Sequence, residues 1–103
     1  MGLKEEFTQA LEGTVEAAKA RNYIPTYFMQ MLSDHGGVET AKRLLATSEP
    51  QTGLFELWNL GILHESMEAV ICDNPRFHPL FEAAEIAEAH RRLEELNYFK
   101  KGK

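Results

Sequence analysis

The fold of this chain is decided by residues 25–46, which read PTYFMQMLSDHGGVETAKRLLA. Pro25 suits a first helical turn, because the N–H that proline lacks has no partner there within the helix. The pair Gly36-Gly37 ends this helix, since glycine takes a left-handed conformation without a Cβ clash. A second helix is predicted from about residue 38 to residue 46. The stretch therefore predicts a helical hairpin with one apolar side, made of Tyr27, Phe28, Met31, Leu32, Val38, Ala41, Leu44 and Leu45.

Apolar residues also recur at spacings of three and four on both sides of this hairpin. They predict four further helices, over about 3–21, 52–60, 64–73 and 82–96. The breaks between helices hold turn residues, with Pro50 in a loop at 47–51, Gly61 in the next break and Asn74-Pro75 in the last. We therefore expect an all-α fold, a compact bundle of about six short helices with helix-turn-helix-like hairpins.

The length of 103 residues fits one domain with one core, over residues 1–103. The first helix has only a narrow apolar stripe, and Gly13 weakens its middle. We therefore expect residues 1–22 to lie at the periphery of the domain or against a partner. Residues 97–103 form a basic tail, which we expect to be frayed, and its charges are Lys100, Lys101 and Lys103.

Composition excludes several classes of protein. The net charge of −5 does not fit a strongly basic nucleic-acid or membrane footprint, although local basic pairs stand at 42–43 and 91–92. A single cysteine excludes an internal disulfide and a cysteine-rich zinc site. The first residues lack the features of a signal peptide, and no apolar run reaches the ~20 residues that span a bilayer. We expect a cytoplasmic protein without a membrane segment.

No pattern for catalysis or cofactor binding is complete. None of the four histidines follows a glutamate by three residues, as a di-iron bundle requires. His64 and Glu68 stand one helical turn apart, but the sequence positions no third metal ligand. Cys72 lies in an apolar run and is expected to be a buried, inert thiol. The Gly36-Gly37 pair lacks the lysine of a phosphate loop. We therefore predict no enzyme, no metal and no cofactor.

The aromatic residues favour packing as their main role. Buried rings dominate the energetics of small cores, so most of the set is expected inside. Phe55 and Trp58 are the exception that we consider, because they could line a groove for a partner helix. The residues considered are Tyr23, Tyr27, Phe28, Phe55, Trp58, Phe77 and Phe81.

The hairpin at 28–45 also has the outline of a helix-turn-helix, whose second helix can enter a major groove. In this alternative the contacts to nucleic acid come from Thr40, Lys42 and Arg43, with help from Arg91 and Arg92. Glu39 at the entry of that helix, and the acidic charge of the domain, oppose it. A plain helical hairpin is therefore the favoured interpretation.

A set of spaced motifs resembles an uncharacterised bacterial all-helical module, which occurs alone or appended to larger proteins. The motifs are Y-x-P-x-x-F from Tyr23, GG-x-ETA-x-x-LL from Gly36 and GL-x-x-LW from Gly53. The resemblance covers about residues 23–96 and brings no catalytic residue. It implies recognition or scaffolding. We predict a non-enzymatic module that binds a protein partner or itself, with nucleic-acid binding as the alternative.

Overall fold

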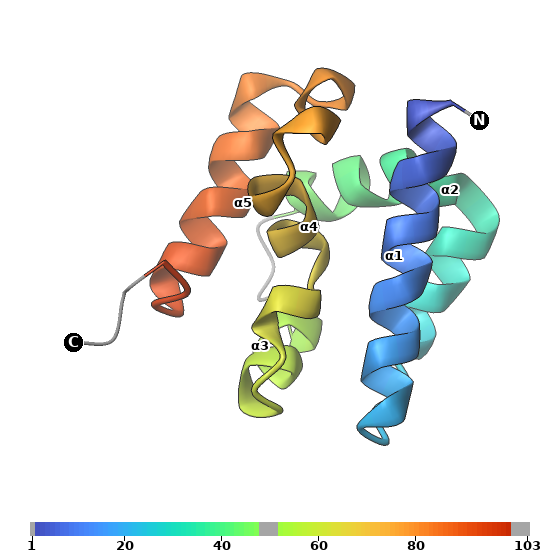
Figure 1. Cartoon of the computed structure of the whole chain (residues 1–103), viewed down its shortest axis with the longest axis vertical. Coiled ribbons are helices and arrows are strands. Elements are labelled where there is room, and N and C mark those ends of the chain that lie inside the picture. The colour runs from blue at the N-terminus through green and yellow to red at the C-terminus, as the bar shows by residue number, and fades with distance from the viewer. Residues whose placement is uncertain (1, 48–51, 100–103) are drawn as a thin grey trace.

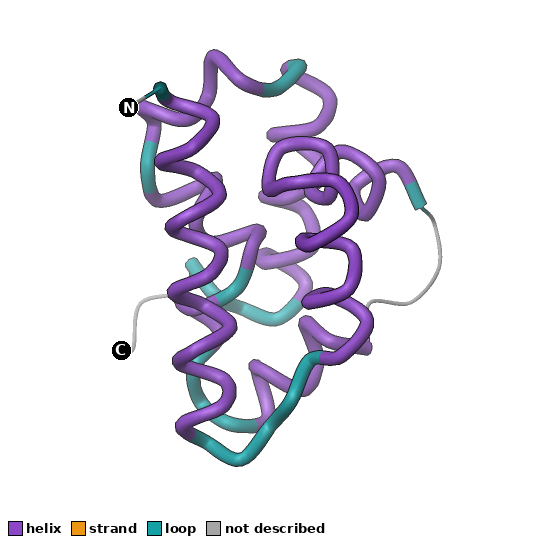
Figure 2. Tube along the Cα trace, turned by 90° about the vertical axis from the view of Figure 1, so that its right-hand side faces the viewer, coloured by secondary structure: helices purple, strands orange, loops and turns teal. Residues whose placement is uncertain are grey.

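The computed structural model describes residues 2–47 and 52–99, and within them every regular element is a helix (Figures 1 and 2). The predicted all-α fold is therefore confirmed. The elements follow in this order: α1 Leu3–Ala20, α2 Thr26–Ala46, α3 Thr52–Asn59, the 3₁₀ helix η1 Leu63–Glu65, α4 Met67–Asp73, the 3₁₀ helix η2 Pro75–Leu80 and α5 Ala83–Glu95.

The glycine pair at 36–37 divides α2 into two helices, as predicted. Gly36 has φ +79° and ψ 172°, a conformation that essentially only glycine adopts, and the helix resumes at once. Gly37 then lies directly against α1, where its N–H donates a 2.9 Å hydrogen bond to Thr8 Oγ1. A Cβ at Gly37 would stand 2.8 Å from the Cα of Thr8. The two glycines thus serve different ends, since one turns the chain and the other lets two helices touch.

The first helix is not peripheral, contrary to our expectation. Phe7 and Leu11 on α1 are fully buried, and the ring of Phe7 packs edge-on against Phe77 and Phe81 with centroids 5.2 Å apart. Figure 1 shows α1 lying along α2 for most of its length. The narrow stripe suffices because the glycine at 37 lets the hairpin approach α1 closely enough to cover it.

The predicted helix over 64–73 is wrong at its start. Ser66 is extended, with φ −103° and ψ 158°, and its Oγ accepts a hydrogen bond from the N–H of Ala69. This cap begins α4 and leaves η1 as a separate 3₁₀ turn before it. The predicted break at Asn74-Pro75 is confirmed, but it leads into the 3₁₀ helix η2 and not into a plain loop.

Positive φ angles at Asn22, Gly61 and Asn97 turn the chain after α1, α3 and α5. After each of these residues a backbone N–H reaches back to the helix, as in a Schellman cap. The last of these turns brings Tyr98 and Phe99 against Leu93 and its neighbours, so residues 97–99 of the expected frayed tail are packed. The loop residues 48–51 and the tail residues 100–103 lie outside the described residues.

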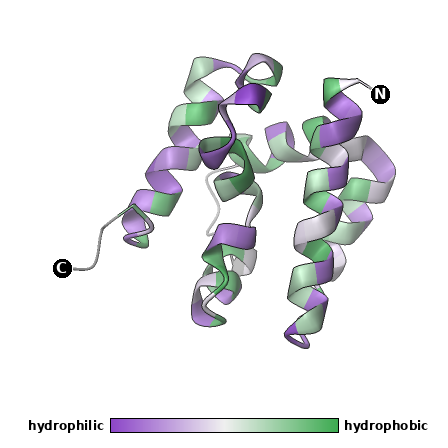
Figure 3. Ribbon diagram, viewed as in Figure 1, coloured by the Kyte–Doolittle hydropathy of each residue, from purple (hydrophilic) through white to green (hydrophobic). Residues whose placement is uncertain are grey.

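No helix in the described parts of the chain combines the length and the apolar character that crossing a membrane requires. The hydropathy pattern in Figure 3 shows why, because polar and apolar turns alternate along α1 and α5.

Candidate functional site

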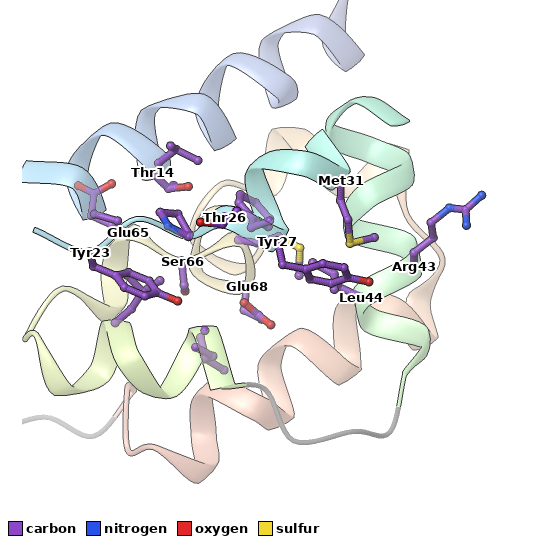
Figure 4. Close-up of a pocket in the computed structure, with 18 of the residues that line it drawn as sticks. Thr14, Tyr23, Thr26, Tyr27, Met31, Arg43, Leu44, Glu65, Ser66 and Glu68 are labelled. Atoms are coloured by element: carbon purple, nitrogen blue, oxygen red, sulfur yellow. The ribbon is translucent and has the colours of Figure 1, made fainter. Parts of the chain in front are cut away.

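An open groove of about 600 Å³ runs between the end of α1, the start of α2, α3 and the start of α4 (Figure 4). Its volume lies in the range of ordinary ligand sites. Tyr23 lies at one end of the close-up and Arg43 at the other, so the groove is elongated. Most of its lining is apolar, including Val15, Ala18, Phe28, Met31, Leu54, Leu57 and Met67.

Ser66 and Glu68 bring polar atoms to the inner wall of the groove. The Ser66 cap starts α4 at this point and so places Glu68 in the first helical turn. Glu68 is only 4% exposed, and its Oε2 accepts a 3.3 Å hydrogen bond from Arg92 Nη1. Burial raises the pKa of the Glu68 carboxyl, although Arg92 opposes this effect. The carboxyl is thus already committed to an internal ion pair.

The charged groups at the edge of the groove are mostly acidic. Arg43 lines the groove, but its Nε donates a 2.9 Å hydrogen bond to Glu39, which offsets its charge. Glu65 lines the groove as well, and its nearest basic group among the described residues is the imidazole of His64 at 3.8 Å. The pKa of Tyr23 is raised by burial and by the nearby carboxylate of Glu56.

Four large hydrophobic side chains are exposed: Ile24 at 54%, Tyr27 at 72%, Phe55 at 49% and Trp58 at 44%. Tyr27 lines the groove itself, and each of the other three is next in sequence to a residue that lines it. We call these four the exposed rim. Leu54 and Leu57 of α3 line the groove, and Phe55 and Trp58, each one residue later, are turned outward by about 100°. In Figure 3, the green of hydrophobic residues is visible on α3, at the lower end of the molecule.

Two walls of the groove are held together by contacts between α3 and the turn that follows α1. Arg21 Nη1 donates a 2.9 Å hydrogen bond to the carbonyl of Leu60, just past the end of α3. The hydroxyl of Tyr23 lies 3.7 Å from where a Cβ of Gly53 would be. These contacts hold the turn that precedes Ile24 against α3, which carries Phe55 and Trp58.

Comparison of the chain with protein families, with curated proteins and with solved structures finds no match. The role of the groove therefore has to be inferred from its own shape, exposure and charge.

The aromatic residues divide between core and surface. Phe77 and Phe81 are buried as predicted, and Phe55 and Trp58 are exposed, with their ring centroids 5.2 Å apart. Sequence reasoning missed the exposure of Tyr27, which it assigned to the apolar side of the hairpin. It also missed Ile24. The one available signal was the position of both beside Pro25, at a helix start where the periodic pattern does not yet apply.

The residues of the nucleic-acid alternative are paired or buried. Thr40 is fully buried and Arg92 is 4% exposed, so neither can contact a nucleic acid in this fold. Lys42 Nζ lies 2.8 Å from Glu85, Arg43 is bonded to Glu39, and Arg91 is bonded to Glu88 and Glu95. Arg92 also donates to the carbonyls of Leu44 and Thr47 at 2.9 Å and so fastens the end of α2 to α5.

The residues considered for metal binding or catalysis do not meet in one place. Over residues 2–47 and 52–99, no three side chains of histidine, cysteine, aspartate or glutamate gather as a metal site. His64 belongs to η1 and is exposed, whereas Glu68 belongs to α4 and is buried, so the proposed one-turn pair does not form. Cys72 is half-buried, and burial together with Asp73 and Glu68 raises the pKa of its thiol to about 11.

Proposed function

We propose that this chain is a non-enzymatic helical module that binds a protein partner, or a second copy of itself, through the groove and its exposed rim. The observation that carries the proposal is an open apolar groove with four large exposed hydrophobic side chains, Ile24, Tyr27, Phe55 and Trp58, which line it or are next in sequence to residues that do. Isolated exposed hydrophobic residues are common on protein surfaces, but a group of large ones beside a groove marks an interaction site.

The chemistry of the surface supports protein binding in particular. Tyrosine, tryptophan and phenylalanine are enriched in the cores of protein interfaces, where they contribute most of the binding energy. The groove is bounded by parts of α1, α2, α3 and α4, and a groove between helices suits the apolar face of a further helix. The resemblance of residues 23–96 to a recurring, appended bacterial module supports a recognition role by analogy. A cytoplasmic location, with no metal or cofactor, belongs to the same proposal.

The fluorescence of the single tryptophan can be used to detect binding at this surface. Trp58 is the only tryptophan in the chain, so its fluorescence reports events on α3 alone. The probe is a synthetic helical peptide of about 18 residues with leucine at i, i+3, i+4 and i+7 and neutral polar residues elsewhere. We expect saturable binding with a shift of the Trp58 emission to shorter wavelength, because the indole loses water contact.

Two variants locate the binding. Tyr27→Ser and Phe55→Ser should each weaken the peptide about fivefold or more, as expected for an aromatic contact residue that contributes over 1 kcal/mol. Glu12→Ser, an exposed position on α1 outside the groove lining, serves as the matched control. Sedimentation of the protein alone tests self-association, which Phe55→Ser should abolish if it occurs. A protein that stays monomeric and gives no emission shift with the peptide would refute the proposal.

Nucleic-acid binding is the alternative. Of its expected residues, Thr40 and Arg92 are buried, and Lys42, Arg43 and Arg91 are paired with glutamates. A mobility-shift titration at low salt against duplex and single-stranded probes distinguishes the two. Binding that falls steeply with added salt, and that is lost in Lys42→Gln and Arg43→Gln, would favour the alternative.

A further inference from the structure

The acidic groups around the groove are not balanced by cations among the residues that the structure describes. Among the described residues, Glu65 meets no lysine or arginine within 4 Å, and the exposed imidazole of His64 is its only basic neighbour. Glu56, close to the groove-lining Tyr23, makes no ion pair within this part of the chain. The one basic side chain of the lining, Arg43, is held by Glu39. The edge of the groove thus carries excess negative charge.

The cations in the neighbourhood do not reverse this balance. Arg21 lies at the turn beside α3, and its Nη1 is bonded to the carbonyl of Leu60. Lys19 lies 3.7 Å from the carboxylate of Glu16 on the same helix. Glu68, deeper in the wall, is matched by Arg92 and contributes no net charge. Within residues 2–47 and 52–99, Glu65 and Glu56 are therefore the carboxylates near the groove without a lysine or arginine partner.

A second copy of the chain fits this charge poorly. The chain carries a net charge of −5, so two copies repel each other at low salt. The basic side chains of α5, Arg91 and Arg92, are bonded to glutamates of the same copy and are not available to a neighbour. A separate, cationic partner satisfies both the apolar floor and the acidic edge.

We infer that the groove binds an amphipathic α-helix of a protein partner whose apolar stripe is flanked by lysine or arginine. The stripe lies on the apolar lining between Phe28, Met31 and Leu57, and the flanking cations meet Glu65 and Glu56. This inference rests on the proposed function and adds to it the charge of the partner. Glu65 is a specificity-determining residue in this arrangement, because it lines the groove while its side chain stays 37% exposed.

The test compares two helical peptides of about 18 residues that share one leucine stripe and differ only in their flanks, which are lysine in one and glutamate in the other. We expect the lysine peptide to bind at least about tenfold more tightly at low salt, because opposite charges attract across the edge of the groove. Raising the salt from about 0.05 M to about 0.5 M should reduce that preference by screening. Trp58 emission and calorimetry measure both dissociation constants.

Two charge reversals separate the local effect from the net charge. Glu65→Lys should abolish most of the preference for the lysine peptide, whereas Glu12→Lys changes the net charge equally and should leave most of it. Circular dichroism melting of both variants verifies that they fold. A third variant, Glu65→Gln, should weaken the lysine peptide by about two- to fivefold, the effect of one exposed ion pair.

The outcomes separate this inference from the proposed function. Equal binding of the two peptides, or tighter binding of the glutamate peptide, overturns the basic partner but leaves apolar docking intact. Equal responses of the Glu65→Lys and Glu12→Lys variants also overturn it, since net charge alone would then explain the preference. Failure of both peptides to bind overturns the docking function itself.

Discussion

Two regions of the molecule use their large hydrophobic side chains in opposite ways. Where α1, α4 and the residues around η2 meet, Phe7, Leu11, Ile71 and Phe77 are 0–1% exposed. At the groove and on α3 beside it, Tyr27 is 72% exposed and Phe55 is 49% exposed, although both carry large aromatic rings. The first region holds the domain together, and the second leaves apolar area available for another molecule.

The carboxylates of the two regions differ in the same way. Glu88 on α5 is bonded to both Arg91 and Arg92, with its Oε2 2.7 Å from each side chain. Glu65 at the groove has no arginine or lysine near it among the described residues. The carboxylate in the first region has cationic partners within the domain, whereas the carboxylate at the groove is available to a cation of another molecule. The differences can be tested by paired substitutions.

The largest expected effect comes from truncating one phenylalanine in each region. Phe7→Ala should destabilise the fold by about 3–5 kcal/mol, because it leaves a cavity between α1 and the rings of Phe77 and Phe81. Phe55→Ala should change stability by about 1 kcal/mol or less, since half of that side chain is already in water. Urea unfolding measures both. Equal losses of stability would show that α3 belongs to the core and would remove the contrast between the regions.

A smaller effect is expected where α1 meets the hairpin. Gly37→Ala should destabilise the fold by about 1–3 kcal/mol, because the new Cβ would stand 2.7–2.8 Å from Thr8 atoms that include its backbone Cα. Gly13→Ala on the same α1 is the matched control, as its Cβ meets nothing within 4 Å. That change should stabilise the helix by about 0.5–1 kcal/mol. Thermal melts of both variants give the sign, and a stable Gly37→Ala protein would contradict the close contact.

The smallest effect concerns pH. The hydrogen bonds from Arg91 and Arg92 lower the pKa of Glu88 to about 2, below its ordinary value of 4.5. A depressed pKa in the folded state adds stability above about pH 4.5, and this stability is lost as the pH falls toward 2. Glu88→Gln should therefore lower the melting temperature slightly at pH 7, with a difference that shrinks below pH 4.5. Glu12→Gln, at an exposed position on α1, is the control for the loss of one carboxylate. A Glu88→Gln difference that is independent of pH would argue against the role of Glu88.

The sequence predicted the helices and their order well, but it predicted only part of the exposed residues at the candidate site. The spacing of Pro25 and the Gly36-Gly37 pair fixed the hairpin, because both residues restrict the backbone locally. The start of α4 was misplaced, since the cap at Ser66 competes with a run of residues that would otherwise continue a helix. Phe55 and Trp58 were weighed as groove residues and are exposed, whereas Ile24 and Tyr27 were not foreseen beside them.

What the sequence determined by itself is the helical architecture, because periodic apolar residues, proline and glycine act over a few neighbouring positions. Only the tertiary structure decided which members of adjacent pairs face inward. Phe28 packs against the core while Tyr27 is 72% exposed, and Arg92 is buried while Arg91 is exposed. The physical reason is that burial is set by side chains that arrive from other helices. Arg92 is covered by Glu68 and by the end of α2, which stand 24 and 45–48 residues away along the chain.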